Sequence, residues 1–189
     1  MSTGWILAAV AVVVVLYLIV VFNRLVRQRN VVREGWSGID VQLRRRTDLV
    51  PNLVESVKGY AAHERTVFEE VTQRRARSIA ASDVSGQAAA ENALVGSLGR
   101  LMAVAEAYPD LKANQNFLEL QKQLSETEDN IQMARRYYNG AVRNLNISIQ
   151  SFPDVIVARM LGFREEPFFE LESRAEAATP QISFPGGKA

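Results

Sequence analysis

The sequence of 189 residues contains no cysteine, and this absence removes several classes of protein at once. Disulfide-stabilised scaffolds, zinc sites built on thiolates, thiol catalysis and lipid attachment through cysteine all need that side chain. A chain without cysteine is compatible with a reducing compartment, although it does not prove one. At this length we expect one domain, with at most a short appendage.

Histidine is almost as scarce, since His63 is the only one. The stretch HERTV, which His63 begins, lacks the second histidine that a zinc metalloprotease helix carries four residues later. The acidic cluster Glu126, Glu128 and Asp129 cannot form a di-metal bundle site, which needs Glu-x-x-His pairs. We therefore interpret His63 as a polar residue near a helix junction and the acidic cluster as a solvated helix face.

Sequence motifs of catalysis are missing too. GSLGR, residues 96–100, fits neither a nucleophile elbow nor a phosphate-binding loop. We predict that the chain is not an enzyme: no catalytic residue, no metal ligand, no cofactor and no small-molecule substrate can be identified.

An excess of charge of one sign is also absent, because 22 basic residues face 21 acidic ones. Nucleic-acid binders usually carry a marked basic excess, so we predict no nucleic-acid partner. Three consecutive arginines, Arg44, Arg45 and Arg46, do not change this. Successive residues of a helix point about 100° apart, so these three side chains cannot bind one phosphate backbone together.

One long hydrophobic run is present, from Gly4 to Phe22, and it contains no charge. As a helix it would span roughly 28 Å, close to the ~30 Å hydrocarbon core of a bilayer. A cleaved signal peptide would have basic residues before the run and a small-x-small site after it, and neither is found. A buried core helix would rarely be apolar on every face. We predict a transmembrane anchor over residues 1–23, with residues 4–22 in the lipid bilayer.

Flanking charge predicts the orientation of this anchor. Only the α-amino group precedes the run, whereas four arginines follow it closely: Arg24, Arg27, Arg29 and Arg33. The positive-inside rule then places the bulk of the chain in the cytoplasm, as a single-pass protein of a cell membrane. Gly4, Ala8 and Ala11 share one face of the anchor, a spacing that permits close helix packing in lipid.

Beyond the anchor the apolar residues recur at intervals of three and four, as expected for packed helices. The first such face, seam 1, comprises Val32, Trp36, Ile39, Leu43, Arg46, Val50, Leu53, Val57, Tyr60, Glu64, Val67 and Val71. Pro51 removes a backbone donor within it, which predicts a kink or break at residues 47–51. Gly59 is a second weak point, and the helix either stops there or continues to about Ala81.

Two more helices are predicted downstream, without any period-two pattern that would indicate a sheet. ASDVSGQ, residues 81–87, reads as a connection, and a short helix follows it and ends before Pro109. A long helix is expected from Leu111 to Ser151, with apolar residues at strict sevens. We predict an all-α fold: a single N-terminal transmembrane helix followed by an antiparallel up-and-down bundle of three to four long helices.

Four charged residues interrupt the apolar faces or lie next to them: Arg46, Glu64, Glu128 and Arg135. A charge that faces a helical core must be paired or must reach solvent, because isolated burial costs several kcal/mol. We hypothesise that Arg46 and Arg135 meet acidic partners such as Glu128 and Glu64 and fix the helix register. The alternative is that these long side chains extend to the bundle surface.

Several stretches together resemble the LemA family of bacterial membrane proteins. They are RNVVREGWSGIDVQLRRRTDLVPNLVESVKGYAAHE, AEAYPDLKANQNFLELQKQLSETEDNIQMARRYYNGAVRNLN, FPDVIVARMLGF and PQISF. The resemblance implies one membrane helix followed by a soluble antiparallel bundle, and some relatives are associated with magnetosome membranes. It supplies no catalytic residues. We expect a LemA-like bundle over residues 24–166 and a flexible tail over residues 167–189, in which QISF is a candidate docking peptide.

Three functions fit these features. The first is a membrane-anchored scaffold or protein-interaction module, working through protein partners or a homo-oligomer. The second is an accessory subunit or regulator of a membrane-associated enzyme, which would need a pocket with converging polar groups. The third is a signal-transmitting stalk in which Pro51 acts as a hinge between anchor and bundle.

Overall fold

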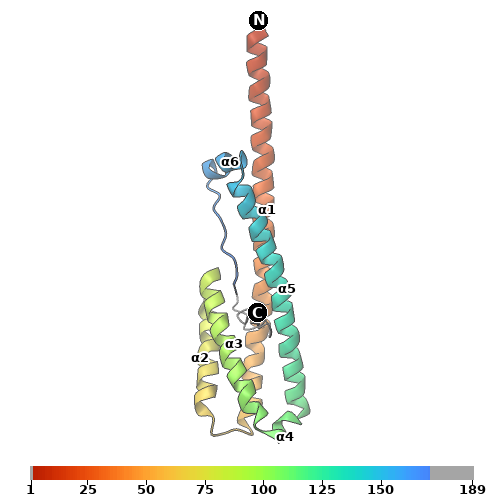
Figure 1. The fold of residues 1–189 in the computed structure, drawn as a ribbon, viewed down its shortest axis with the longest axis vertical. Helices are drawn as coiled ribbons and strands as arrows, with labels where there is room; N and C mark the ends of the chain where they lie inside the picture. Colours follow the sequence, from red (N-terminus) through yellow and green to blue (C-terminus); the bar gives the residue numbers. More distant parts are fainter. Residues whose placement is uncertain (1, 171–189) are drawn as a thin grey trace, which may run out of the picture.

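The computed structural model describes residues 2–170, and within that range helices are joined by short turns. The helices are α1 (Ser2–Lys58), α2 (Arg65–Ala80), α3 (Val84–Glu106), α4 (Pro109–Lys112), α5 (Gln115–Gln150) and α6 (Asp154–Met160). Figure 1 shows that α5 returns alongside α1, while α2 and α3 form a pair beside the lower half of α1. The all-α fold class is confirmed for the described range, in which no strand occurs.

The helix α1 passes through Pro51 without interruption, so the break expected at residues 47–51 is absent. Proline has no N–H, and a helix that contains it leaves the carbonyl four residues earlier without its usual donor. Here that carbonyl belongs to Thr47, and Arg75 of α2 donates its Nε–H to it at 2.7 Å. A side chain from a neighbouring helix therefore replaces the missing backbone donor.

The helix ends lie close to glycine, proline and capping residues. α1 ends one residue before Gly59, so it does not continue to Ala81. The connection predicted at residues 81–87 is shorter, because α3 already begins at Val84 with Asp83 accepting a hydrogen bond from the backbone N–H of Gly86. The predicted helix from Leu111 is divided: α4 ends at Lys112, and α5 begins after Asn114, whose side chain caps it.

The core consists of two apolar clusters stacked along α1. The upper cluster joins α1 to α5, α6 and the segment that follows α6, and Leu25, Ile39, Ile131, Tyr138 and Phe169 lie in it. The lower cluster joins the end of α1 to α2, α3, α4 and the start of α5. Since α1 contributes to both clusters, it connects the upper and lower parts of the molecule.

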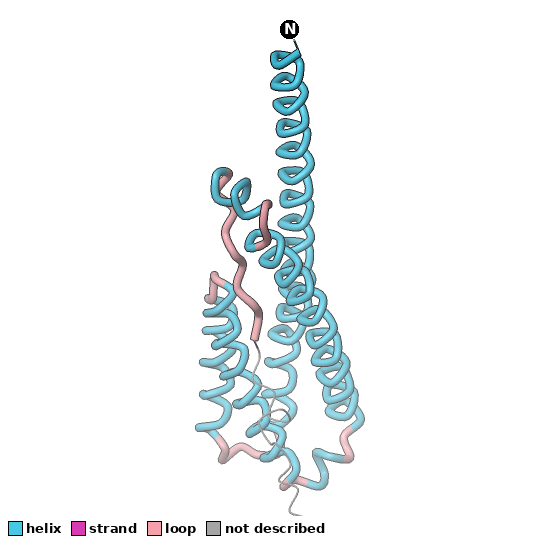
Figure 2. The backbone as a smooth tube through the Cα atoms, turned by 45° about the horizontal axis from the view of Figure 1, so that its top comes forward, coloured by secondary structure: helices cyan, strands magenta, loops and turns pink. Residues whose placement is uncertain are grey.

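The segment after α6 runs back down the molecule in extended form (Figure 2). Asn146 of α5 accepts from the backbone N–H of Glu166 and donates to its carbonyl, both at 2.9 Å. Asn139 makes the same pair of bonds to Phe169, at 2.9 and 3.1 Å. Phe169 is buried against Trp36 of α1. Pro167 and Phe169, which were expected to belong to a flexible tail, are therefore bound to α5, and residues 171–189, including QISF, lie outside the described range.

Candidate functional site

The most unusual polar feature of the described chain is a buried ion-pair cluster in the middle of the bundle. Arg46 of α1 has no exposed surface, and its guanidinium forms ion pairs with Glu91 of α3 and Glu128 of α5. One terminal nitrogen donates to both oxygens of Glu128, at 2.8 and 2.9 Å. The other donates to Glu91. Three helices that are distant in sequence thus meet at one side chain.

Glu91 is fully buried as well, and two further residues satisfy its second oxygen. Ser78 at the end of α2 donates its hydroxyl at 2.5 Å, and Gln87 donates its amide at 2.7 Å. The same amide also donates to the backbone carbonyl of Ser78, at 3.2 Å. We refer to Arg46, Glu91, Glu128, Ser78 and Gln87 as the arginine cluster; its members come from α1, α2, α3 and α5.

The electrostatics of the arginine cluster hold Arg46 in its charged form. Burial alone lowers the pKa of Arg46, but the nearby carboxylates of Glu128 and Glu91 more than offset this effect, and the net pKa is raised. The formal charge of the three ionised groups is −1, because two carboxylates face one guanidinium. The side chain of Glu128 is 35% exposed, so water can solvate the excess negative charge.

The chemistry available at the arginine cluster is that of a structural contact. An arginine cannot give up its proton near neutral pH, and both carboxylates are already engaged. A surface cleft of about 540 Å³ adjoins the cluster, but Ser78 and Gln87 line it whereas Arg46 and the two glutamates do not. Within residues 2–170, no three His, Asp or Glu side chains converge in a way that would hold a metal ion.

The structure brings together two of the four charged residues singled out from the sequence, Arg46 and Glu128. Glu64 precedes α2 and is half-buried; it lies 14 positions before Ser78, about 20 Å further down the bundle. Arg135 lies two turns beyond Glu128 on α5, half-buried and engaged in a contact of its own. Arg44 and Arg45, the neighbours of Arg46, are exposed.

Glu91, Ser78 and Gln87 were not identified from the sequence, although the helical period contains a signal for Glu91 and for Ser78. Glu91 lies three residues before Leu94, a buried apolar residue of α3, and so falls on the same face. Ser78 lies seven residues after Val71, the last residue of seam 1. Extending each apolar face by one or two turns would have reached both residues.

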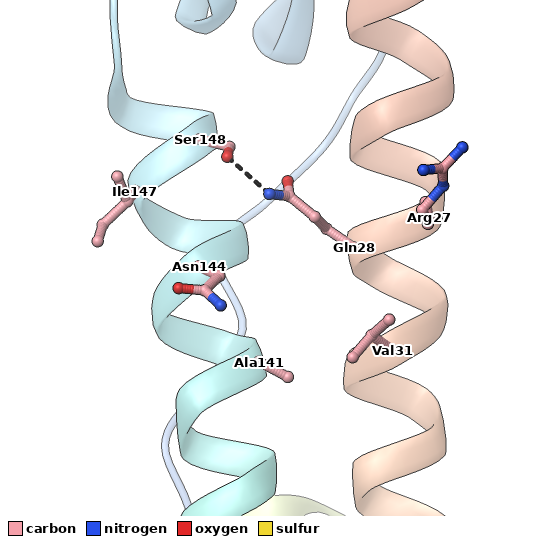
Figure 3. A pocket seen from close by; sticks show the side chains of 7 residues that line it. All are labelled: Arg27, Gln28, Val31, Ala141, Asn144, Ile147 and Ser148. Atoms are coloured by element: carbon pink, nitrogen blue, oxygen red, sulfur yellow. Dashed lines mark hydrogen bonds between the residues drawn. The ribbon is translucent and has the colours of Figure 1, made fainter.

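A second polar site lies between α1 and α5, nearer the apolar end of α1. It is an open groove of about 360 Å³, lined by Arg27, Gln28, Val31, Ala141, Asn144, Ile147 and Ser148. Figure 3 shows Gln28 reaching across the groove, and its amide donates to the Ser148 hydroxyl at 2.9 Å. Arg27 points away from the groove in this view. The groove therefore has a polar bridge, and Arg27 is the one titratable residue in its lining.

The apolar end of α1 is exposed and free of contacts for several turns. Residues 3–17 are exposed, and Gly4, Ala8 and Ala11 are among them. By length and composition, this is the one helix among the described residues that is long and apolar enough to cross a membrane. The first contact with the rest of the chain is made by Tyr17, whose hydroxyl donates to Asp154 of α6 at 2.7 Å.

Comparison with known proteins assigns the family. The profile of the LemA family matches residues 35–184, about four fifths of the chain. The chain belongs to the LemA family. The match starts within α1 and includes all the later helices, so the arginine cluster lies inside the LemA region and the apolar end of α1 lies outside it.

The individual proteins that this chain resembles are 26–29% identical to it. Magnetosome protein MamQ 2 of Paramagnetospirillum magneticum is 26% identical over 189 aligned positions, covering 85% of this chain and 70% of the relative. Magnetosome protein MamQ of Magnetospirillum gryphiswaldense is 26% identical, with 77% and 64% covered. Protein LemA of Metamycoplasma hominis is 29% identical, with 78% and 68% covered. None of these names describes an enzyme.

Proposed function

We propose that this LemA-family protein is a single-pass membrane-anchored scaffold that works by binding other proteins or a second copy of itself. One observation carries the proposal: a single helix, α1, contains both the exposed apolar segment and the residues that contribute to both core clusters of the bundle. No linker separates the anchor from the bundle, so the bundle keeps a fixed position relative to the anchor helix and changes its direction only when that helix tilts. A fixed platform of this kind suits the presentation of a binding surface.

We further propose that the bundle lies in the cytoplasm. The absence of cysteine gives a direct test, because any introduced cysteine is unique. Thr3→Cys and Gln73→Cys, both at exposed positions, can be treated in intact cells with a membrane-impermeant maleimide. We expect labelling at position 3 in intact cells and at position 73 only after permeabilisation. Labelling at position 73 alone in intact cells would reverse the orientation, and labelling at both would disprove a membrane-spanning anchor.

The scaffold role is tested by crosslinking in native membranes followed by mass spectrometry. We expect recurrent crosslinks from exposed lysines, such as Lys112 and Lys122 at the lower end of the bundle, to another protein or to a second copy. A protein that remains monomeric and yields only internal crosslinks would disprove the role. Crosslinks to one enzyme alone would instead identify an accessory subunit or regulator.

The signal-transmitting stalk can no longer rely on a hinge at Pro51. It placed a hinge at Pro51, but α1 is unbroken there and Arg75 bonds to the carbonyl that proline leaves free. Any signal carried by α1 would therefore be transmitted by motion of the whole helix, and we rank this function below the scaffold.

A further inference from the structure

The short helix α6 is fixed against the last turns of the apolar segment of α1. Asp154 accepts a hydrogen bond from Tyr17 and forms an ion pair with Arg24. Phe163, just after α6, packs edge-on against Phe22 with ring centroids 6.2 Å apart. Figure 1 shows α6 beside α1, below the free N-terminal part of that helix. These contacts fix the height of α6 relative to the anchor.

Large apolar side chains in α6 and directly beside it are exposed. Phe152 is 82% exposed and Met160 is 74% exposed, and Ile156 and Leu161 are each at least half exposed. We call these four residues the α6 apolar face. Four large apolar side chains within ten residues form an exposed patch of the kind that marks an interaction surface.

The length of the free apolar helix indicates what covers this face. Above the contact at Tyr17, the apolar segment Gly4–Leu16 contains 13 residues. It would cross only about 20 Å, whereas the hydrocarbon core is ~30 Å thick. The missing 10 Å corresponds to about six more residues, down to Phe22. A bilayer that reaches this level surrounds α6 as well.

The charges around α6 suit the surface of an anionic leaflet. Arg159 and Arg164 are exposed, and Arg27 lies on α1 just below. Asp154, which pairs with Arg24, is the only acidic residue between positions 151 and 164, and Glu165 and Glu166 follow directly after Arg164. Exposed arginines next to large apolar side chains are typical of segments that lie at the headgroup–acyl boundary.

We infer that the α6 apolar face is inserted into the lipid leaflet at the Phe22 end of α1, so that α6 and α1 together form the membrane-binding unit. This inference rests on the proposed membrane anchoring. It differs from a plain single-span anchor because residues more than 120 positions away in sequence also enter the lipid. It also assigns the Asp154–Arg24 ion pair a place at the bilayer surface.

The test uses the full-length chain carrying one fluorophore on a unique cysteine, reconstituted into vesicles of phosphatidylcholine and phosphatidylglycerol with brominated acyl chains. The labelled sites are Met160→Cys, Val13→Cys in the anchor and Ile79→Cys on α2, all exposed positions. We expect bromine to quench the label at positions 160 and 13 but not at position 79. Bromine near the headgroup end of the acyl chain should quench position 160 most, and bromine near the chain end should quench position 13 most.

The outcomes separate this inference from the anchoring on which it rests. Quenching at position 13 with none at position 160 overturns the insertion of α6 and leaves the anchor intact. No quenching at position 13 overturns the anchor itself. A label at position 160 that is shielded from aqueous iodide but unquenched by brominated lipid shows that a second protein copy covers the α6 apolar face, which also overturns the inference.

Discussion

Gly35 of α1 lies directly against the backbone of Tyr138 on α5. A Cβ atom built on Gly35 would be 3.1 Å from the Cα of Tyr138, a contact that backbone atoms cannot relieve by changing a rotamer. Gly38, one turn later, has nothing within 4 Å of the same position. The two glycines of GWSG therefore have different roles, and only the first sets the separation of α1 and α5.

This difference gives a matched pair of variants. Gly38→Ala should raise the free energy of unfolding by about 0.5–1 kcal/mol, because alanine favours the helix and meets nothing. Gly35→Ala gains the same propensity but pushes α5 away, and overpacking costs about 1–3 kcal/mol, so a net loss is expected. Chemical denaturation of the full chain in detergent, followed by circular dichroism, measures both. An equal gain in the two variants would show that α1 and α5 are not in close contact at Gly35.

The arginine cluster predicts a large difference between neighbouring arginines. Arg46→Ala leaves Glu91 buried without its cation, and removing one partner of a buried ion pair costs about 3–5 kcal/mol. Arg44→Ala removes a side chain that is 77% exposed and pairs with Asp40 within the same helix. Because exposed ion pairs contribute little, we expect this variant to lose less than about 1 kcal/mol of unfolding free energy. Thermal and chemical unfolding of both variants test this. Similar losses at the two positions would contradict a buried cluster.

The bond from Arg75 to the Thr47 carbonyl predicts coupling between α2 and Pro51. Arg75→Ala removes the one side-chain donor to that carbonyl, and a charge-assisted hydrogen bond contributes about 1.5–3 kcal/mol. Pro51→Ala restores a backbone N–H to the same carbonyl, so Arg75→Ala should cost less in that background. A double-mutant cycle measures the difference, which we expect to be about 1 kcal/mol. Arg77→Ala on the same helix is the control, and equal costs of Arg75→Ala in both backgrounds would disprove the coupling.

Tyr138 predicts a loss of stability at alkaline pH. Its hydroxyl donates to the Pro167 carbonyl at 2.9 Å, and burial, with the negative charge of Glu166 as the second cause, raises its pKa to about 12. The unfolded chain ionises near pH 10, so the stabilisation is complete below about pH 10 and is lost as the pH rises through about 12. The stability of the wild type relative to Tyr138→Phe should fall by about 2 kcal/mol between about pH 8.5 and pH 11.5. A difference that is independent of pH would contradict the raised pKa.

The sequence predicted features that follow from local periodicity. The apolar residues at sevens, from Phe117 onward, predicted a long helix that the structure contains as α5. Seam 1 placed Arg46, and neither Arg44 nor Arg45, on the inward side, in agreement with the observed burial. These predictions depend only on the helical repeat, which any single helix carries in its own residues.

Features that depend on contacts between distant elements were not predicted. The donor that compensates for Pro51 comes from α2, so α1 taken alone indicated a break. Glu91 reaches Arg46 only because α3 packs on α1 in one register. The extended segment after α6 was assigned in part to the tail because its partners, Asn146 and Asn139, lie on a helix face 20 and 30 residues earlier. Sequence spacing within one element carries no information on such pairings.

With α1 anchored in a bilayer as proposed, its continuity makes the orientation of the bundle sensitive to bilayer thickness. From Phe22 to Lys58 the helix extends 36 residues, a rise of about 54 Å. Membrane helices tilt by about 20° on average, and more when the bilayer is thinner than their apolar length. A rigid helix of this length that tilts by 20° moves its far end sideways by about 18 Å. In a bilayer of changing thickness, the lower end of the bundle would therefore move sideways by distances of this order, while the part of α1 at the lipid surface stays in place.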